Sequence, residues 1–183
     1  MLETLAKWTL DDYHRTIDAG ILSDRKVELL NGNIVEKSPE GPIHYFITSD
    51  IADYLRSRLG NAAKVRETGP ITLSDRSEPE PDIAVVKPLG IVYRDRHPYP
   101  EDVFWTIEIA YSSIGRDLGE KVSAYGRAGI SEYWVVDLQK LEVIVMRSPS
   151  DAGYERCQVF TSGRISPAAF PNLDITIAKL LGG

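Results

Sequence analysis

The spacing of hydrophobic residues along the chain predicts three helices. Apolar residues recur every three or four positions in residues 10–19 and 43–59, which indicates two amphipathic helices. Thr9 precedes the first, with Asp12 three residues later as its capping-box acid, and a glycine follows each helix. A third helix is expected over about residues 117–128, closed by Gly129.

Short apolar runs between these helices predict a sheet. Residues 27–30 and 34–36 flank Asn31 and Gly32, a pair that readily adopts the positive φ angles of a tight hairpin turn. Further strands are expected at residues 65–73 (interrupted near Gly69), 82–86, 103–110, 132–137, 141–147 and 154–160. Residues 87–102 form a connection long enough to serve as a lid or a binding edge. The order of elements predicts one domain, residues 1–183, of mixed α/β (α+β) class, with a central mixed β-sheet flanked by helices.

Composition and charge narrow the class of protein. With 43% hydrophobic and 26% charged residues, the chain resembles ordinary soluble globular proteins. No apolar run approaches the ~20 residues of a membrane span, and the acidic start of the chain is unlike a signal peptide. The single Cys157 fits a reducing compartment, so we expect a cytoplasmic protein with no membrane partner. The net charge of −6 argues against a non-specific nucleic-acid coat protein, but not against a nuclease whose acidic metal ligands await a cation.

Two of the predicted strands carry one carboxylate at or near an end. Asp82 opens residues 82–86 after a proline, and Glu108 is third from the end of residues 103–110. If these strands are neighbours, both carboxylates project from one edge of the sheet and can share a divalent cation such as Mg²⁺ or Mn²⁺. Lys121, about one turn into the next helix, could then stabilise charge developing on a phosphate. Two acids and a lysine are the parts that metal-dependent phosphodiester hydrolysis requires.

Each of these residues also has a purely structural interpretation. Glu108 could form a salt bridge with a neighbouring Lys or Arg. Lys121 could pair with Asp117 on a helix surface, and Glu28 in the first strand could face solvent instead of completing a metal site. His44, at the start of the second helix, is as readily an exposed polar residue as a catalytic one. The chain has no phosphate-binding loop, dinucleotide fingerprint, paired CxxC, HExxH or GxSxG pattern, which leaves carboxylate–metal chemistry as the only organised signal.

Four segments, taken in order, resemble the Uma-type restriction endonucleases of the PD-(D/E)XK nuclease superfamily. They are VELLNGNIVEKSPEGPIH, SEPEPDIAVV, WTIEIAYSS and DLGEKVSAYGRAGISEYWVVD, and together they span residues 27–137. The resemblance implies a restriction-endonuclease-like core with a four-stranded mixed sheet, a divalent metal, and hydrolysis of DNA. It implies that Asp82 and Glu108 are the motif acids. Lys121 would replace the lysine that usually follows the second acid by two residues, where this chain has Ala110.

The leading hypothesis is therefore a Mg²⁺- or Mn²⁺-dependent DNA endonuclease. The metal ligands would be Asp82, Glu108 and Glu28, and the further catalytic candidates are Lys121, His44 and Tyr125. The alternative is a catalytically inactive nuclease-fold module for binding or assembly, favoured by the negative net charge and by Ala110. Cutting both strands of a duplex requires two active sites, so we also expect a homodimer.

Overall fold

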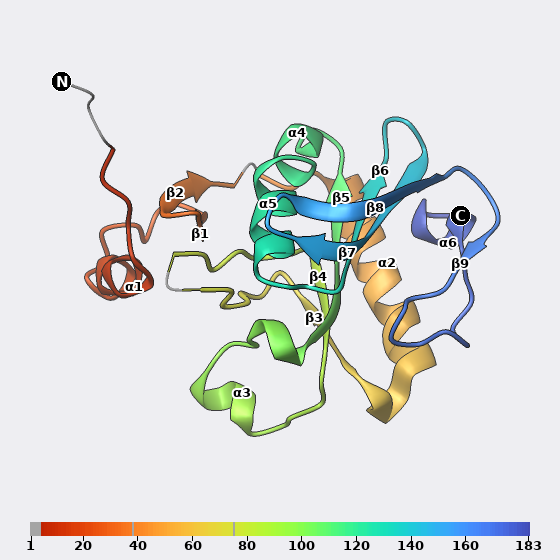
Figure 1. Ribbon diagram of the computed structural model, residues 1–183, viewed down its shortest axis with the longest axis horizontal. Helices are drawn as coiled ribbons and strands as arrows, with labels where there is room; N and C mark the ends of the chain where they lie inside the picture. Colours follow the sequence, from red (N-terminus) through yellow and green to blue (C-terminus); the bar gives the residue numbers. More distant parts are fainter. Residues whose placement is uncertain (1–4, 38, 75) are drawn as a thin grey trace.

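A six-stranded mixed sheet forms the centre of the computed structural model, which describes residues 5–37, 39–74 and 76–183 (Figure 1). Its strands, in spatial order, are β3 (Lys64–Glu67), β4 (Ile83–Val86), β5 (Val103–Ala110), β6 (Glu132–Asp137), β7 (Glu142–Ser150) and β8 (Gly153–Phe160). Neighbouring strands are antiparallel except β5 and β6, which run parallel. The mixed sheet is confirmed, although it has six strands and not the four implied by the resemblance, because the β7–β8 hairpin extends it beyond β6.

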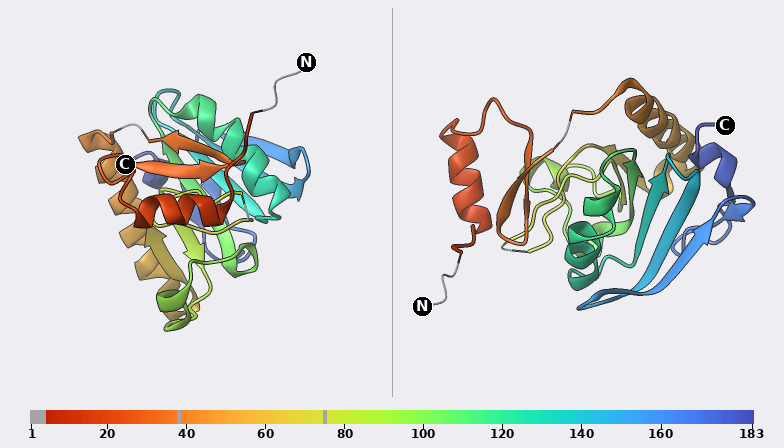
Figure 2. Two further views of the ribbon diagram at one scale, coloured as in Figure 1. Left: turned by 90° about the vertical axis from the view of Figure 1, so that its left-hand side faces the viewer. Right: turned by 90° about the horizontal axis from the view of Figure 1, so that it is seen from above.

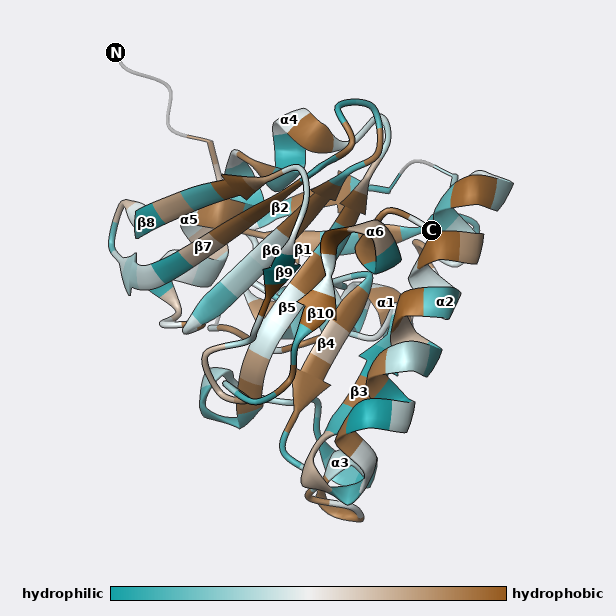
Figure 3. Ribbon diagram, turned by 90° about the vertical axis from the view of Figure 1, so that its right-hand side faces the viewer, coloured by the Kyte–Doolittle hydropathy of each residue, from teal (hydrophilic) through white to brown (hydrophobic). Residues whose placement is uncertain are grey.

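Helices and short C-terminal elements cover the two faces of this sheet. The helices are α1 (Leu10–Asp18), α2 (Pro42–Leu59), α3 (Val92–Asp95), α4 (Ile114–Asp117), α5 (Glu120–Arg127) and α6 (Ile177–Leu180), and two 3₁₀ turns span Gly60–Ala62 and Pro100–Asp102. On one face lie α2, α6 and the small β9 (Arg164–Ile165) and β10 (Ile175–Thr176) pair, whereas α5 packs on the other face against β7 and β8 (Figures 1 and 3). No helix in the described part of the chain combines the length and apolar character needed to cross a bilayer.

Alternation along β5 separates the two hydrophobic cores. Trp105, Ile107 and Ile109 are fully buried on the α2 face, whereas Ala110 belongs to the core beneath α5. Because successive side chains of a strand point to opposite faces, Glu108 lies on the α5 face with Ala110. The strand thus directs its one carboxylate towards the helix that follows it.

The N-terminal elements form a separate layer at the side opposite the C-terminus (Figure 2). The hairpin of β1 (Val27–Leu30) and β2 (Asn33–Glu36) turns at Asn31 and Gly32, whose φ angles are 50° and 74°, as the sequence predicted. The Thr9–Asp12 capping box of α1 is likewise confirmed. β1 is buried along its whole length, and Glu78 N donates a 2.8 Å hydrogen bond to Leu29 O. This buried strand positions Glu28 inside the protein.

Three predicted segments differ from the structure. The strand expected at residues 65–73 ends at Glu67, because Thr68 turns the chain with a φ of 45°. The helix expected at residues 117–128 is divided into α4 and α5, with Gly119 in a non-helical conformation between them. The connection at residues 87–102 contains α3 and a 3₁₀ turn and is held by a 2.6 Å contact between Arg96 and Asp102. It lines no part of the cleft described below, so it is not a lid over that cleft.

Candidate active site

The sheet register brings Asp82 and Glu108 together. Because β4 and β5 are antiparallel, with Ile83 opposite Ile107, the start of β4 lies beside the end of β5. Asp82 N lies 3.4 Å from Glu108 Oε2, and Ile109 N donates a 2.7 Å hydrogen bond to Asp82 Oδ2. Both acids are buried, with 5% and 2% of their surface exposed. The expectation that these two strands are neighbours is confirmed.

Helix α5 places Lys121 and Tyr125 against Glu108. Lys121 Nζ lies 2.8 Å from Glu108 Oε1 and 3.7 Å from Glu28 Oε2. The Tyr125 hydroxyl donates a 2.9 Å hydrogen bond to the same Oε1 of Glu108. The chain reaches α5 on its crossover between the parallel strands β5 and β6, which brings the helix over the α5 face of β5. A lysine therefore stands beside the second acid even though residue 110 is alanine.

Glu28 and Asp117 add two further buried carboxylates. Glu28 is fully buried, and its Oε2 accepts a 3.0 Å hydrogen bond from Glu80 N. Its Oε1 is buried without a hydrogen-bond partner among the described residues. Asp117 is only 3% exposed and accepts a hydrogen bond from the Ser113 hydroxyl. The interpretations of Glu28 as solvent-facing and of Asp117 with Lys121 as a surface pair are therefore wrong.

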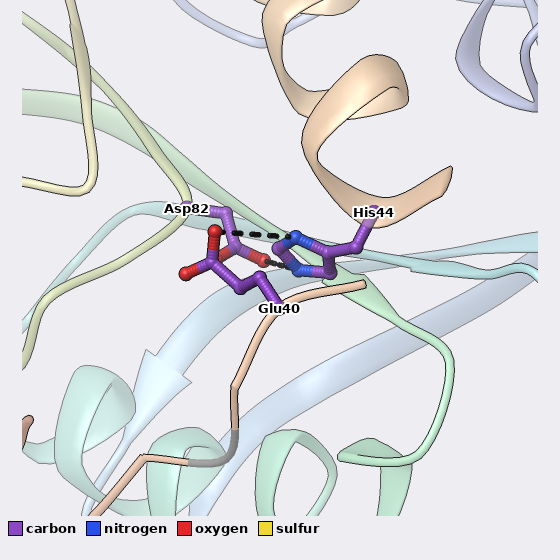
Figure 4. Close-up of side chains that lie close together, drawn as sticks. All are labelled: Glu40, His44 and Asp82. Carbon is purple, nitrogen blue, oxygen red and sulfur yellow. Dashed lines mark hydrogen bonds and ion pairs between the residues drawn. The ribbon is translucent and has the colours of Figure 1, made fainter. Parts of the chain in front are cut away.

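His44 reaches the same edge of the sheet from the first turn of α2. Its Nε2 lies 3.0 Å from Asp82 Oδ2, and its Nδ1 lies 3.7 Å from Glu40 Oε2 (Figure 4). The ligand atoms of Glu40, His44 and Asp82 all lie within 4.8 Å of one another. Sequence reasoning missed Glu40, although its position four residues before His44, in the loop that enters α2, was the available signal.

A cleft of about 520 Å³ joins these groups. Five of the six predicted site residues line it, and Tyr125 lies behind Glu108. The remaining lining residues come from the loop before α2 and the start of that helix, and from the turn after β5 and helix α4. They include the basic Lys37 and Arg116. The cleft thus presents carboxylates, an imidazole and cationic side chains to one enclosed volume.

Burial and charge together set the protonation of the cleft. Burial raises the pKa of Glu108 to about 8, and the nearby Lys121 ammonium offsets only part of this effect. Burial also opposes ionisation of Asp82, but the hydrogen bond and charge of His44 outweigh it and hold the pKa of Asp82 below its usual value. Desolvation lowers the pKa of His44, yet the contacts with Asp82 and Glu40 leave that pKa above its usual value. Burial likewise opposes the charge of Lys121, but its acidic neighbours raise the pKa of this ammonium.

The donor set of the cleft fits a divalent cation. The ammonium of Lys121 faces four carboxylates, those of Glu28, Asp82, Glu108 and Asp117, and all five side chains are buried. Buried anions need compensating charge, and when all four acids are ionised, one ammonium leaves an excess of negative charge that a cation can balance. Oxygen ligands of this kind suit Mg²⁺ and Mn²⁺. The unpartnered Oε1 of Glu28 is a further acceptor available to a cation or its water.

Comparisons with known proteins show the family and the fold of the chain. The profile of the Uma2 family, described as "Putative restriction endonuclease", matches residues 10–178. The chain belongs to the Uma2 family. The crystal structure of "a putative nuclease belonging to DUF820" from Anabaena variabilis ATCC 29413 is similar to it with a TM-score of 0.76, over 95% of this chain and 97% of that one. At 20% sequence identity, this likeness confirms the mixed α/β fold.

Uma2 membership confirms the resemblance seen in the sequence and supports a nuclease function. A nuclease is a hydrolase, and the cluster of Glu40, His44 and Asp82 could bind a metal. None of the curated proteins compared with the chain matches it.

Proposed function

We propose that this Uma2 chain is a metal-dependent endonuclease that hydrolyses phosphodiester bonds of DNA. The observation that supports the proposal most strongly is the convergence of Asp82, Glu108, Glu28 and Lys121 on one cleft from four separate segments of the chain. Burying four ionisable side chains together costs stability, so such a cluster is found mainly where it serves a function.

Each residue has a distinct role in this proposal. Asp82, Glu108 and Glu28 would hold Mg²⁺ or Mn²⁺, which when bound polarises the scissile phosphate and lowers the pKa of a bound water. The Lys121 ammonium stabilises the negative charge that develops on the phosphate during hydrolysis. Tyr125 positions Glu108 by donating to its Oε1, while Oε2, which among the described residues accepts only a long 3.4 Å hydrogen bond from Asp82 N, is the oxygen offered to the cation. Lys37 and Arg116, on the wall of the cleft, offer positive charge to the DNA backbone.

The position of Lys121 favours an active enzyme over an inactive binding module. The main argument for inactivity is Ala110, which stands where a catalytic lysine is usual. Lys121, on helix α5, supplies an ammonium that lies 2.8 Å from Glu108. This ammonium takes the place of the lysine that is absent at residue 110. The negative net charge is also accounted for in part, because buried acids of the cleft contribute to it until a cation binds.

Cleavage of supercoiled plasmid and of single-stranded DNA tests the proposal, with Mg²⁺, Mn²⁺ or EDTA present. We expect metal-dependent cutting by the wild type, and a loss of roughly 100-fold or more for Asp82→Asn and Lys121→Met. Lys140→Met is the matched control, because the Lys140 side chain is 68% exposed and its Nζ lies 3.7 Å from Glu142 Oε1, away from the cleft. Circular dichroism checks that each variant is folded. Equal background cutting by all four proteins would favour the inactive module instead.

We further propose a cytoplasmic homodimer. Cutting both strands of a DNA duplex requires two active sites, so the active species should carry two clefts. The single cysteine of the chain, Cys157, is exposed and suits a reducing compartment. Light scattering during size-exclusion chromatography measures the mass directly. A protein that cuts both strands at one site as a monomer at every concentration would contradict the dimer.

A further inference from the structure

The edge of the His44 ring that carries its two nitrogens faces two carboxylates in the cleft. Figure 4 shows one ring nitrogen facing Asp82 and the other facing Glu40. The His44 side chain is 13% exposed, that of Asp82 8% and that of Glu40 23%, so the group is largely shielded from water. A charged or strongly polar group in such a place needs defined partners.

Hydrogen bonding within the protein does not complete this arrangement. His44 Nδ1 is buried and has no hydrogen-bond partner among the described residues, because the 3.7 Å gap to Glu40 Oε2 is too long for one. The fully buried Glu28, which lines the same cleft, independently leaves its Oε1 without a partner in the described part of the chain. The unpartnered Oε1 of Glu28 indicates that the cleft is built around a group that the polypeptide itself does not supply, whereas His44 Nδ1 already has Glu40 Oε2 close by.

We propose that His44 coordinates the cation of the cleft through Nε2, beside Asp82, with Glu40 as the carboxylate that orients the ring. This inference rests on the proposed function and adds the identity of a ligand and the preferred class of metal. The 3.0 Å between Nε2 and Asp82 Oδ2 equals the separation of two ligands that lie about 2.1 Å from one cation at a right angle.

The position of Glu40 matches the usual surroundings of a metal-bound histidine. Such a histidine donates its second ring N–H to a carboxylate, a carbonyl or water, which fixes both the tautomer and the ring orientation. Glu40 Oε2 already faces Nδ1, and its partly exposed side chain has room to close the remaining gap. Glu40 lies in the loop just before α2 and His44 in the first turn of the helix, so the start of α2 brings both side chains close to Asp82.

An imidazole ligand changes which metal the cleft prefers. Carboxylates and water suit Mg²⁺, whereas imidazole favours first-row transition metals. A site with Asp82, Glu108 and His44 should therefore bind Mn²⁺ more tightly than Mg²⁺. The competing explanation is a plain hydrogen bond between His44 and Asp82, in which His44 orients the acid and never contacts a metal.

Electron spin echo envelope modulation of the full chain with one equivalent of Mn²⁺ separates these explanations without DNA. The chain contains three histidines, His14, His44 and His97. We expect ¹⁴N modulation from a directly bound imidazole, its replacement by the ¹⁵N pattern after histidine labelling, and its loss in His44→Ala. His14→Ala is the matched control, because His14 Nε2 also contacts a buried carboxylate, Glu78 Oε1 at 2.7 Å, outside the cleft.

Calorimetric titration with Mn²⁺ and with Mg²⁺ provides the second measurement. His44→Ala should weaken Mn²⁺ roughly 10-fold or more and Mg²⁺ less than roughly 3-fold, whereas Glu40→Gln should weaken Mn²⁺ roughly 10-fold and keep the nitrogen modulation. Mn²⁺ bound without nitrogen modulation, or with modulation that survives His44→Ala, would overturn His44 ligation and leave the nuclease proposal standing. Failure to bind Mn²⁺ at all would overturn both.

Discussion

Removal of the Lys121 ammonium tests how the cleft balances its charge. Methionine keeps a long unbranched side chain and deletes the charge that lies 2.8 Å from Glu108 and 3.7 Å from Glu28. Coulomb's law with an effective dielectric constant of about 20 gives about 4–6 kcal/mol for each contact when its carboxyl group is ionised. Much of that attraction is offset by the cost of taking the ions out of water, so the net effect of Lys121→Met is smaller.

The net effect is also limited because a further acid of the cleft can take up a proton in place of the lost ammonium, since Glu108, with a pKa of about 8, is already largely protonated at pH 7. For a carboxyl group with an ordinary pKa of about 4.3, that protonation costs about 3.7 kcal/mol at pH 7 and about 1 kcal/mol at pH 5. We therefore expect the free energy of unfolding of metal-free Lys121→Met to lie about 3–4 kcal/mol below the wild type at pH 7. At pH 5 the difference should shrink to about 1 kcal/mol.

Urea denaturation in EDTA, followed by the fluorescence of the buried Trp105 and Trp134, measures both values. Lys140→Met, at the exposed pair with Glu142, should change the free energy of unfolding by about 0.5 kcal/mol or less at either pH. A loss for Lys121→Met that is equally large at pH 5 and pH 7 would show that packing and not charge is responsible. A loss below about 1 kcal/mol at pH 7 would refute the charge balance itself.

Three further predictions follow from the same contacts. Since burial raises the pKa of Glu108 to about 8, a cation must displace its proton below that pH. Mn²⁺ affinity in calorimetry should therefore rise by roughly 10-fold per unit or more from pH 6 to 8 and then level off, and a constant affinity over that range would contradict this. Tyr125→Phe removes a donor to Glu108 and should lower kcat for DNA roughly 10-fold with little change in KM, whereas an unchanged kcat would exclude the positioning role. Gly126→Ala would place a Cβ 2.1 Å from Gly153 O and should lower the free energy of unfolding by about 3 kcal/mol. In the matched variant Gly115→Ala the new Cβ meets nothing within 4 Å, so the free energy of unfolding should change by less than about 1 kcal/mol. Equal effects of the two variants in chemical denaturation would contradict this packing.

Much of the local structure could be read from the sequence because it depends on neighbours within a few residues. The Thr9 capping box, the Asn31–Gly32 turn and the helical period of α2 are all of this kind. The strand containing Glu108 was also predictable, since a period of two assigns its carboxylate to one face. The errors arose where one residue changes the backbone direction, as Gly119 does between α4 and α5 and Thr68 does after β3.

The sequence by itself determined which groups could form the site: two acids on strand ends, a lysine on the next helix, and the segments that show Uma2 membership. Only the tertiary structure decided which of them meet. The pairing of β4 with β5 brings Asp82 to Glu108, the crossover helix brings in Lys121, and α2 brings Glu40 and His44. The physical reason is that these contacts join different elements of the fold: Asp82 is 26 positions from Glu108 and 38 positions from His44. They depend on strand order and on packing across the sheet, which no local spacing specifies.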